Sequence, residues 1–232
     1  MQRTVVVSGA SRGIGLAISQ SLIADGHSVI ALARDFSHTG FKHKNFSTHC
    51  VDLGDSAQPD AELQSLLQER PVDALVSNAG RGRFGSLEQY SAQQIQHELQ
   101  INLVSHILLC RFLVPYLKRL KRSDIVFIGS ESALQGGRYG SIYSAAKFGL
   151  RGFAQALRHE CANSNCHVGV VNPGMVRTDF FSELNFEPGD DDDNALLAED
   201  VAAAVMQMLH SADRAVIDEI NLNPLKKVIR KK

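Results

Sequence analysis

A tyrosine and a lysine stand four residues apart in Tyr143-Ser144-Ala145-Ala146-Lys147, at the start of an Ala-rich stretch that predicts a helix. Residues i and i+4 share one face of a helix, so the lysine ammonium can lie beside the phenol. Two unit charges ~4 Å apart interact by ~4 kcal/mol at an effective dielectric constant of ~20. An interaction of that size could lower the pKa of the phenol from ~10 toward ~7. Such a phenol can act as a general acid or base near neutral pH.

Ser130 lies thirteen residues before Tyr143 and just past the apolar run from Ile125 to Ile128. A serine hydroxyl in this place could hydrogen-bond the substrate oxygen with which the phenol exchanges a proton. Ser132 is a possible rival for this role. Both patterns also have a plainer interpretation, because Tyr-x-x-x-Lys pairs occur on ordinary helices and serine is common in turns.

The chain begins with a segment that predicts a strand, a glycine-rich turn and a helix. Thr4 to Val7 is a β-branched run, and Gly9, Gly13 and Gly15 follow it with the spacing G-x-x-x-G-x-G. Glycines in such a turn allow a sharp bend, close approach of N–H groups to a pyrophosphate and close packing of helix on strand. The N-terminus of the following helix, which ends at Gly26, would face negative charge. No Lys-Ser or Lys-Thr follows, so this is not a Walker loop; a plain glycine-rich turn is the alternative.

The motifs of the chain together resemble the short-chain dehydrogenase/reductase family. The matching motifs are Ser8-Gly9 with Gly13-Ile14-Gly15, Asp52-Leu53, Ser77-Asn78-Ala79-Gly80, Asn102, Ser130, Tyr143 with Lys147, and Asn172-Pro173-Gly174 with Thr178. They follow the family's order and spacing from residue 4 to about residue 180, and Val216 to Ile220 resembles its last strand. Two departures are small, since Ser8 replaces the more common threonine and Ser77 replaces the first asparagine of Asn-Asn-Ala-Gly.

The resemblance implies carbonyl–alcohol redox chemistry with a nicotinamide cofactor. Tyr143 would give its proton to the carbonyl oxygen in reduction and take the alcohol proton in oxidation. Ser130, rather than Ser132, would bind the same oxygen, and Lys147 would lower the phenol pKa and hydrogen-bond the nicotinamide ribose. Asn102, on a long predicted helix, would position a water that supplies protons to Lys147. The alternative for Asn102 is a polar residue that makes only local bonds.

The resemblance also implies a set of cofactor-binding residues. They are Gly9, Ser11, Arg12, Gly13, Ile14, Gly15, Arg34, Asp52, Leu53, Asn78, Ala79, Gly80, Tyr143, Lys147, Pro173, Gly174, Val176 and Thr178. Asp52 and Leu53 would contact the adenine, and Asn78 to Gly80 would line the adenosine side. Thr178 would help to hold the nicotinamide end. Asp52 could instead be the N-cap of a helix.

We expect the cofactor to be NADP(H) rather than NAD(H). An NAD-selective site places an acid at the end of the second strand, where it accepts hydrogen bonds from the ribose hydroxyls. This position holds Ala33, Arg34 follows it, and Asp35 comes one or two residues too late unless the strand end shifts. Arg12 lies in the glycine-rich turn, near the expected ribose. Two guanidiniums can bind a 2′-phosphate through charge-assisted hydrogen bonds, although both could also be solvated surface residues.

Strand-like and helical segments alternate along the chain. The expected strands are Thr4 to Val7, His27 to Ala33, Phe46 to Val51, Asp73 to Ser77, Asp124 to Gly129, Cys166 to Val171 and Arg214 to Ile220. After the first helix, the expected helices are Ser56 to Glu69, Ser91 to about Leu120, Ile142 to Ala162 and Ala198 to Leu209. This alternation predicts an α/β fold, a doubly wound parallel sheet of about seven strands with helices on both faces. Residues 1–232 would form a single NAD(P)-binding Rossmann domain.

The segment from about Val176 to Ala198 is expected to be a substrate loop that is mobile without ligand. Pro188-Gly189 and the run Asp190 to Asp193 disfavour continuous regular structure, and active-site lids often have this character. The aspartate run lacks the spacing of a calcium loop, no zinc-ligand spacing occurs, and no metal is expected. The aromatic residues that could line a pocket, with core packing or loop anchoring as the alternative for the phenylalanines, are Tyr139, Phe180, Phe181 and Phe186.

Bulk composition limits the partners and the compartment. The 232 residues carry a formal net charge of −1, which gives no electrostatic reason for a nucleic-acid or membrane partner. The basic tail from Lys226 to Lys232 would be a solvated end. Four cysteines without a C-x-x-C motif, and no signal-like or membrane-length apolar run, predict reduced thiols and a cytoplasmic protein.

Apolar stripes on two predicted helices suggest an oligomer. In the family the corresponding helices pair across a two-fold axis, so a homodimer or homotetramer is expected. The alternative is that each stripe packs only on its own sheet. The stripes are Leu99, Leu103, Ile107, Leu108 and Phe112 on one helix and Leu150, Phe153, Ala154 and Leu157 on the other.

The sequence therefore predicts an NADP(H)-dependent oxidoreductase that interconverts a carbonyl and an alcohol on a small or medium-sized substrate. The first alternative is a catalytically inactive NADP-binding sensor on the same scaffold. Such proteins usually lose a catalytic residue, whereas Asn102, Ser130, Tyr143 and Lys147 are all present. A second alternative is an epimerase or dehydratase of the extended family, which usually has a larger substrate domain and G-x-x-G-x-x-G spacing. The substrate itself does not follow from the sequence.

Overall fold

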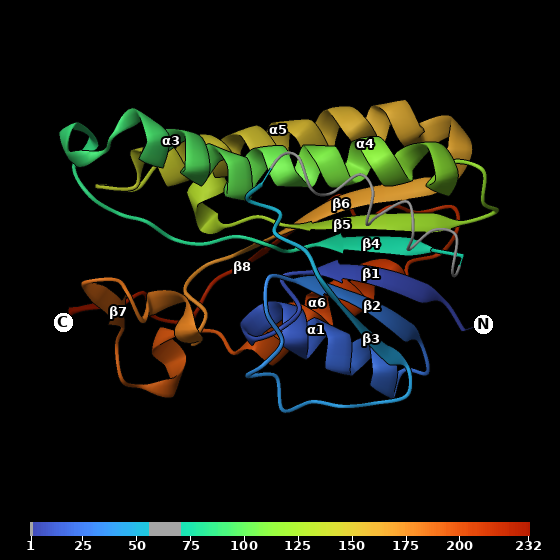
Figure 1. Cartoon of the computed structure of the whole chain (residues 1–232), viewed down its shortest axis with the longest axis horizontal. Coiled ribbons are helices and arrows are strands. Elements are labelled where there is room, and N and C mark those ends of the chain that lie inside the picture. Colours follow the sequence, from blue (N-terminus) through green and yellow to red (C-terminus); the bar gives the residue numbers. More distant parts are fainter. Residues whose placement is uncertain (1, 56–70) are drawn as a thin grey trace.

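The fold is built on a parallel sheet that takes its strands from the whole length of the chain. The computed structural model describes residues 2–55 and 71–232. Seven strands lie in the order β3-β2-β1-β4-β5-β6-β8, and every neighbouring pair is parallel (Figure 1). Strands are added to one side of β1 and then to the other, which leaves a switch point between β1 and β4, where sheets of this kind bind ligands. The predicted fold class and number of strands are confirmed.

The strands are short and mostly apolar because helices cover both faces of the sheet. Their bounds are β1 Thr4–Ser8, β2 Ser28–Ala33, β3 Phe46–Cys50, β4 Ala74–Ser77, β5 Ser123–Ile128, β6 Cys166–Pro173 and β8 Glu219–Leu222. The first six agree with the predicted strands within about two residues. The last is shifted along the chain, because pairing with β6 begins only at Glu219, opposite Val170.

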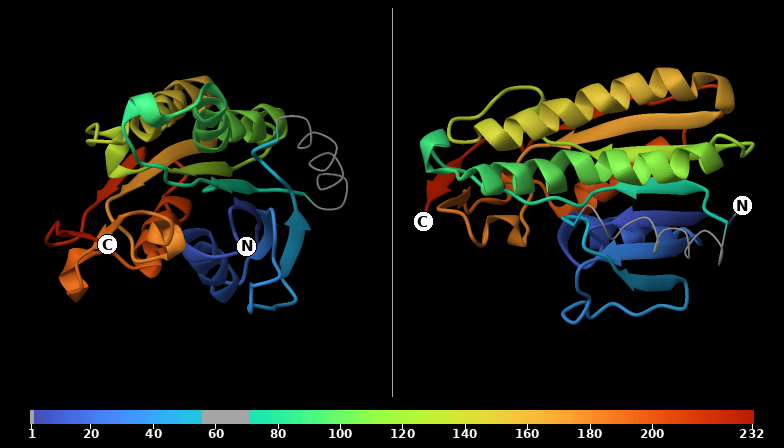
Figure 2. Two further views of the ribbon diagram at one scale, coloured as in Figure 1. Left: turned by 60° about the vertical axis from the view of Figure 1, so that its left-hand side comes forward. Right: turned by 45° about the horizontal axis from the view of Figure 1, so that its top comes forward.

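Helices form a layer on each face of this sheet. Their bounds are α1 Gly13–Ala24, α3 Ala92–Leu99, α4 Ser105–Leu117, α5 Ser141–Cys161 and α6 Ala198–Leu209. One layer contains α3, α4 and α5, and the other contains α1 and α6 (Figure 1; Figure 2). Alternate side chains of β5 serve the two cores, with Phe127 packed in the first and Val126 in the second. The helix expected over residues 56–69 lies outside the described residues.

A π-helical turn interrupts the long helix that we predict over residues 91–120. Gln100–Val104 is π-helical and lies between α3 and α4, with Asn102 buried at its centre. The Asn102 side chain donates a hydrogen bond to the backbone carbonyl of Glu98. A side chain inserted beside the backbone ladder is a known cause of such interruptions, which are frequent at functional sites.

The helical segment Ala92–Leu117 is long and apolar enough to match a membrane span by length and composition, with a mean hydropathy of 1.3. In this fold, Leu109, Leu113 and Leu117 of the same segment are buried in the core against the sheet. Their burial accounts for part of the apolar composition of the segment.

A small second sheet joins the predicted substrate loop to the C-terminal tail. β7 Phe186–Pro188 pairs antiparallel with β9 Ile229–Lys231. Ion pairs reinforce this contact, joining Lys226 to Asp193 and Arg230 to both Glu187 and Asp190. The tail is exposed, as expected, but it is not a free end, because its positive charges complement the acidic loop.

Candidate active site

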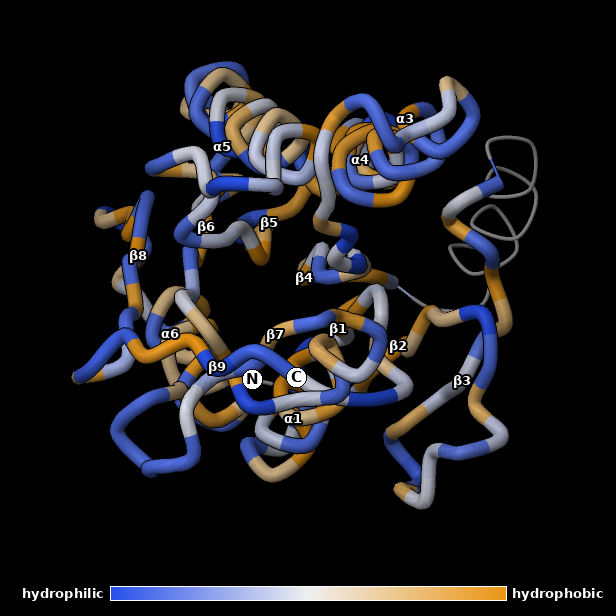
Figure 3. The backbone as a smooth tube through the Cα atoms, turned by 90° about the vertical axis from the view of Figure 1, so that its left-hand side faces the viewer, coloured by the Kyte–Doolittle hydropathy of each residue, from blue (hydrophilic) through white to orange (hydrophobic). Residues whose placement is uncertain are grey.

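Strand ends bring the predicted motifs to one edge of the sheet. The carboxyl ends of β1 and β4 lead into the glycine-rich turn and the Asn78 motif, and those of β5 and β6 lead to Ser130 and Gly174. Figure 3 looks onto this edge, with the strands between the two helix layers. Ligands of open parallel sheets bind beyond this edge.

Tyr143, Ser130 and Lys147 form a buried polar cluster here. Tyr143 and Lys147 lie one turn apart on α5, and Ser130 follows β5. The Nζ of Lys147 is 5.8 Å from the centroid of the Tyr143 ring and donates to the backbone carbonyl of Ile128 at 3.0 Å. A hydrogen bond joins Ser130 to the phenol of Tyr143. The structure thus places the three residues singled out by their spacing side by side.

Ser132, the rival of Ser130, contributes through its backbone. Its N–H donates to the Oγ of Ser130 at 3.1 Å. Because this bond uses a lone pair of the oxygen, the hydroxyl proton of Ser130 is left to bond the phenol oxygen or a substrate oxygen.

Burial dominates the ionisation of this cluster. Desolvation raises the pKa of Tyr143 to about 12, against the hydrogen bond from Ser130, which lowers it. Desolvation also lowers the pKa of Lys147 to about 8. We expected the ammonium to bring the phenol pKa toward ~7, but the structure places it above its ordinary value. The phenol therefore holds its proton at neutral pH.

Asn102 lies beside this cluster with both ends of its amide bonded. Its Nδ2 donates to the backbone oxygen of Glu98 at 3.1 Å and to Glu98 Oε2 at 3.3 Å. Its Oδ1 accepts from the backbone N–H of Arg81 at 3.1 Å. A Cβ on Gly80 would lie 3.0 Å from Asn102 Oδ1 and 3.8 Å from Lys147 Nζ. Asn102 thus makes local bonds, as the alternative held, and also lies near the lysine.

The glycine-rich turn has the backbone shape of a phosphate cradle. Gly9 and Gly13 have φ angles of +66° and +54°, in the region that favours glycine. A Cβ on Gly15 would lie 2.3 Å from the carbonyl oxygen of Gly9, so only glycine fits there. No side chain caps α1 at Arg12, which leaves N–H groups of the first turn available to an anion. These residues fit the pyrophosphate of a dinucleotide.

Other predicted cofactor residues surround this turn. Asn78 Nδ2 donates to the carbonyl oxygens of Ser8 and Gly9, at 2.9 Å and 3.2 Å, and so fixes the turn. The Thr178 methyl group lies 3.5 Å from the place that a Gly13 Cβ would take. Asp52 closes a local turn by accepting from a backbone N–H, and the helix that it could cap lies outside the described residues.

Arg12 and Arg34 are exposed on segments that meet at this turn. The hydroxyl of Thr39 donates to the backbone oxygen of Ser11 at 2.7 Å, which holds the segment after β2 against the glycine-rich turn. Arg34 directly follows the end of β2. Asp35 is engaged in a local turn with the backbone and hydroxyl of Ser37. Arg12 pairs with the exposed Asp179 at 4.0 Å.

Aromatic side chains cover Tyr143. Its ring centroid lies 5.4 Å from that of Phe84 and 6.1 Å from that of Phe180. Phe186, on β7, is 5.1 Å from Phe84, and the buried Phe181 is 5.2 Å from Phe180. The three predicted phenylalanines therefore pack on one another or on Phe84, as the packing alternative held, and Phe180 also borders the phenol. The ring of the exposed Tyr139 instead lies against the guanidinium of Arg138.

Sequence reasoning missed Phe84, Arg81 and Glu98. Arg81 and Phe84 follow the Asn78 motif just beyond a strand end, and that position was the only available signal, because ligand contacts concentrate there. Glu98 looks like an ordinary polar residue of an amphipathic helix, and nothing in the sequence marks it as buried.

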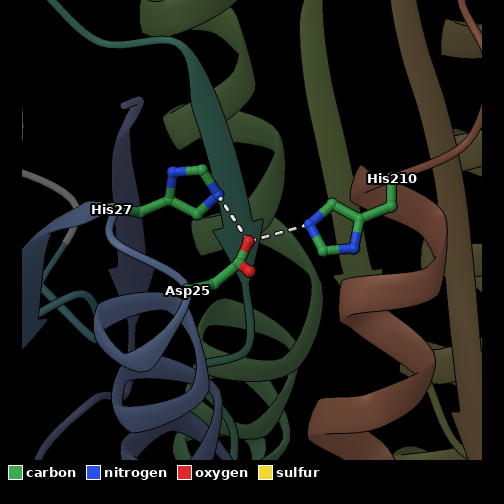
Figure 4. A group of neighbouring side chains, drawn as sticks. All are labelled: Asp25, His27 and His210. Atoms are coloured by element: carbon green, nitrogen blue, oxygen red, sulfur yellow. Dashed lines mark hydrogen bonds and ion pairs between the residues drawn. The ribbon is translucent and has the colours of Figure 1, made fainter. Parts of the chain in front are cut away.

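A separate group of potential metal ligands lies at the opposite edge of the sheet. Asp25 Oδ2 is 3.1 Å from His27 Nε2 and 2.9 Å from His210 Nε2 (Figure 4). The Nδ1 of His27 accepts from the backbone N–H of Arg3 at 3.2 Å, so the ring proton is on Nε2 and is donated to Asp25. A metal ligand must offer a lone pair at that nitrogen instead. We therefore assign this group to the contact between the ends of α1 and α6.

Comparison with known proteins agrees with this geometry. The sequence model of the short chain dehydrogenases matches residues 3–188. The chain is 30% identical to a sepiapterin reductase from Chlorobaculum tepidum, with 97% of each chain covered. It is 32% identical to a human 3-oxoacyl-(acyl-carrier-protein) reductase, with 81% of each covered. It is 34% identical to human retinol dehydrogenase 8 over 78% of its own length, but it spans only 61% of that protein.

Solved structures share the fold over the whole chain. An alcohol dehydrogenase from Thermococcus sibiricus, complexed with 5-hydroxy-NADP, has a TM-score of 0.85 at 24% identity, with 98% of this chain and 99% of that chain covered. A 3-ketoacyl-(acyl-carrier-protein) reductase from Brucella melitensis, complexed with NADH, has a TM-score of 0.84 at 21% identity, with 97% and 98% covered. Fold, motifs and relatives together show that this chain belongs to the short-chain dehydrogenase/reductase family and is an NAD(P)-dependent oxidoreductase acting on CH–OH or C=O groups.

Proposed function

We propose that the protein is an NADP(H)-dependent reductase of a small or medium-sized carbonyl compound. The observation that carries this proposal is the state of Tyr143, a buried phenol with a pKa of about 12 that is hydrogen-bonded to Ser130. A phenol that keeps its proton at neutral pH is ready to give it to a carbonyl oxygen. Lys147, one helical turn away, is placed to stabilise the negative charge that the phenol would then carry.

In this mechanism a hydride and a proton together convert the carbonyl to an alcohol. A reduced nicotinamide, held by the glycine-rich turn and the residues around it, would supply the hydride when bound. Tyr143 gives its phenolic proton to the carbonyl oxygen, while the Ser130 hydroxyl donates a hydrogen bond to that oxygen. Lys147 stabilises the phenolate and passes it a proton, and Asn102 lies across Gly80 from the lysine, where it would position a water that replaces this proton. Oxidation of an alcohol uses the same groups in reverse.

The choice of NADP(H) rests on the residues at the adenosine end. β2 ends at Ala33, which cannot accept hydrogen bonds from ribose hydroxyls as an acid would. Arg34 follows it, and Arg12 lies at the N-terminus of α1. Because Thr39 ties these segments together, the two exposed guanidiniums would bind a 2′-phosphate between them.

The aromatic side chains next to Tyr143 support an apolar substrate. Phe84 and Phe180 lie over the phenol, so a molecule that presents a carbonyl to Tyr143 must contact their rings. Such walls favour uncharged ketones or aldehydes with aliphatic or aromatic groups. A panel of these compounds, with absorbance of the reduced cofactor as the readout, is the substrate screen that the site calls for.

We also propose that the enzyme is a cytoplasmic homodimer or homotetramer that binds neither nucleic acid nor membrane. The nearly neutral formal charge of −1 supports the absence of such charged partners. Half-buried apolar side chains on α4 and α5 support the assembly.

The variant Tyr143→Phe tests the proposed function. It removes the phenolic oxygen and keeps the ring that packs against Phe84 and Phe180. We expect turnover of the best substrate to fall by at least ~10²-fold, while NADPH binding, measured by fluorescence titration, changes little. Tyr116→Phe on α4 is the matched control and should retain the wild-type rate.

Two outcomes would contradict this proposal. If Tyr143→Phe keeps the wild-type kcat, the phenol is not the proton donor. If the wild-type protein binds NADPH but reduces none of the carbonyl compounds, the inactive sensor becomes the better description.

A further inference from the structure

An ion pair with a buried carboxylate lies next to Asn102 at the proposed active site. The side chain of Glu98, in the last turn of α3, is 1% exposed, while that of Arg81 is 41% exposed. Arg81 Nε and Nη2 both donate to Glu98 Oε1, at 2.8 Å and 2.5 Å. Burying a carboxylate has a large desolvation cost even when it is paired. The free energy of folding alone therefore does not explain why a charged Glu98 lies in this position.

Both members of the pair also hold Asn102. Glu98 accepts from Asn102 Nδ2 through its backbone oxygen and its Oε2. The backbone N–H of Arg81 donates to Asn102 Oδ1. These bonds fix both ends of the amide, so that it cannot rotate while the pair is intact. Gly80, next to Arg81, is the point at which Asn102 and Lys147 approach each other.

The negative charge of the Glu98 carboxylate acts electrostatically on the phenol of Tyr143. It raises the pKa of Tyr143, although burial has the larger effect. Glu131 acts in the same direction, but its carboxylate is paired with Lys227 near the surface at 2.6 Å. Glu98 is surrounded by protein, where water and salt screen a charge much less. Its negative charge thus helps the phenol to keep its proton.

We propose that Glu98 and Arg81 are a positioning pair for proton transfer, which fixes the amide of Asn102 and keeps a buried negative charge behind Tyr143 and Lys147. This inference rests on the proposed function. Neither side chain would touch the reacting atoms, and neither residue belongs to the motifs that predict the site.

Glu98→Gln is the variant that separates charge from shape. It keeps the size of the side chain, removes the charge, and leaves one acceptor oxygen where Glu98 offers two, one to Arg81 and one to Asn102. We expect kcat for carbonyl reduction to fall by about tenfold or more, with little change in KM. The limb at high pH that reports proton loss from Tyr143, as distinct from the fall near pH 8 that Lys147 causes, should move to lower pH, because the charge that opposes proton loss from Tyr143 is gone. Arg81→Lys keeps a cation but not the two-nitrogen contact, and should give an intermediate rate.

Asp124→Asn is the matched control. The Asp124 side chain is 3% exposed and is paired with Arg3 at 2.5 Å, but it lies at the start of β5, at the amino edge of the sheet. Both Asp124→Asn and Glu98→Gln should lower the temperature of thermal unfolding. Only Glu98→Gln should change kcat and the pH profile. Equal kinetic changes in both variants would overturn the proposal, since any lost buried charge would then have the same effect.

A measurement that needs no enzymatic turnover tests separately whether Glu98 and Arg81 position the Asn102 amide. The side-chain amide hydrogens of Asn102, assigned in NMR spectra by comparison with Asn102→Asp, should exchange slowly in the wild type. Exchange should be faster in Glu98→Gln and Arg81→Lys and unchanged in Asp124→Asn. Unchanged exchange in both site variants would refute the pair.

The two measurements keep this proposal distinct from the proposed function. If the wild type reduces no carbonyl compound, the proposed function fails, while the exchange of the Asn102 amide still supports or refutes the positioning pair. If Glu98→Gln does not fold, Arg81→Lys, with its partly exposed side chain, decides by the same readouts.

Discussion

Tyr143 and Lys147 are both buried, yet burial moves their pKa values in opposite directions. A phenol is neutral when protonated, so desolvation raises its pKa to about 12. An ammonium is charged when protonated, so desolvation lowers the pKa of Lys147 to about 8. Near neutral pH the phenol therefore has its proton and the lysine is still mostly charged, which is the state that carbonyl reduction requires.

The pH dependence of the rate follows from these values. We predict that kcat/KM for carbonyl reduction falls as the pH rises through about 8, because Lys147 loses the charge that stabilises the phenolate. Initial rates from about pH 6 to about pH 10 at constant ionic strength measure this. Lys147→Arg cannot lose its charge in this range, so any activity that it retains should lack the fall. A wild-type profile that is flat through pH 8 would exclude this role for Lys147.

We expect two exposed arginines to decide the cofactor preference. We predict that the wild type has a higher kcat/KM with NADPH than with NADH. Replacing Arg12 and Arg34 together by alanine should lower kcat/KM with NADPH, because two charge-assisted contacts of about 1.5 kcal/mol each are lost. The same replacement should change kcat/KM with NADH only a little. Arg119→Ala, on an exposed residue just beyond α4, is the control. A wild type that prefers NADH, or a double variant with unchanged preference, would show that the assignment is wrong.

Among the elements, the segment from Val176 to Ala198 differs most from a plain loop. It contains β7 and short 3-10 turns at Asp179–Phe181 and Asp192–Asn194. The C-terminal tail holds it through β9 and through ion pairs on the surface. Exposed ion pairs of this kind are individually weak and are screened by salt. The structure thus joins the loop that carries Phe180, a neighbour of Tyr143, to the C-terminal tail through a short β-ladder and surface ion pairs.

Hydrogen exchange tests the behaviour of this loop. We predict that exchange over residues 176–198 is fast without ligand and slower in a ternary complex with cofactor and substrate analogue. Replacing Lys226 and Arg230 together by alanine should speed exchange in the ligand-free form, because their ion pairs with Asp193, Glu187 and Asp190 are lost. Arg158→Ala, which breaks an exposed pair elsewhere, should not. Equal protection of the loop in the ligand-free and ternary forms would argue against closure.

The elements show what a sequence can predict here. Buried parallel strands need continuous apolar runs, and the runs at β4 and β5 were therefore visible. The bounds of α6 were also predicted, because its apolar residues recur with helical spacing. The π-helical turn at Asn102 could not be found in this way, since it depends on one side chain that bonds a backbone carbonyl. The pairing of β7 with β9 was hidden for a similar reason, as it joins short segments about forty residues apart.

The candidate active site was also predictable only in part. Strand ends and motif spacing located Ser130, Tyr143 and Lys147, because topology alone brings strand ends together. The pKa values were not predictable, since burial and not the nearby charge decides them. Glu98 was not predictable, since its burial depends on how α3 packs. The prediction that residues 1–232 form one domain stays a prediction.

At the scale of the whole molecule, the predicted apolar stripes contain both buried side chains and partly exposed ones. Leu150, Ala154 and Leu157 of the predicted stripe are buried in the core against the sheet, as the single-chain alternative held. Leu103 is only partly buried, and Phe148 is 45% exposed. The remaining apolar surface is therefore smaller than the sequence stripes suggested.

Light scattering tests the proposed assembly. We predict that the wild type is a dimer or tetramer at micromolar concentration. Phe148→Glu should dissociate it, because a charge buried in an interface without a partner is strongly unfavourable. Leu225→Glu, on the most exposed large apolar residue of the described chain, is the control and should not. A monomeric wild type would remove the proposal.

The central claim is that Tyr143 gives a proton to a carbonyl that receives its hydride from the reduced nicotinamide. Its most direct test uses NADPH that carries deuterium at the transferred position, with mass spectrometry of the alcohol product. We predict that each product molecule from the wild type contains a single deuterium on the carbinol carbon. Tyr143→Phe should bind the same cofactor and form almost no labelled product. An unlabelled alcohol from the wild type, or labelled product formed at the wild-type rate by Tyr143→Phe, would contradict this account.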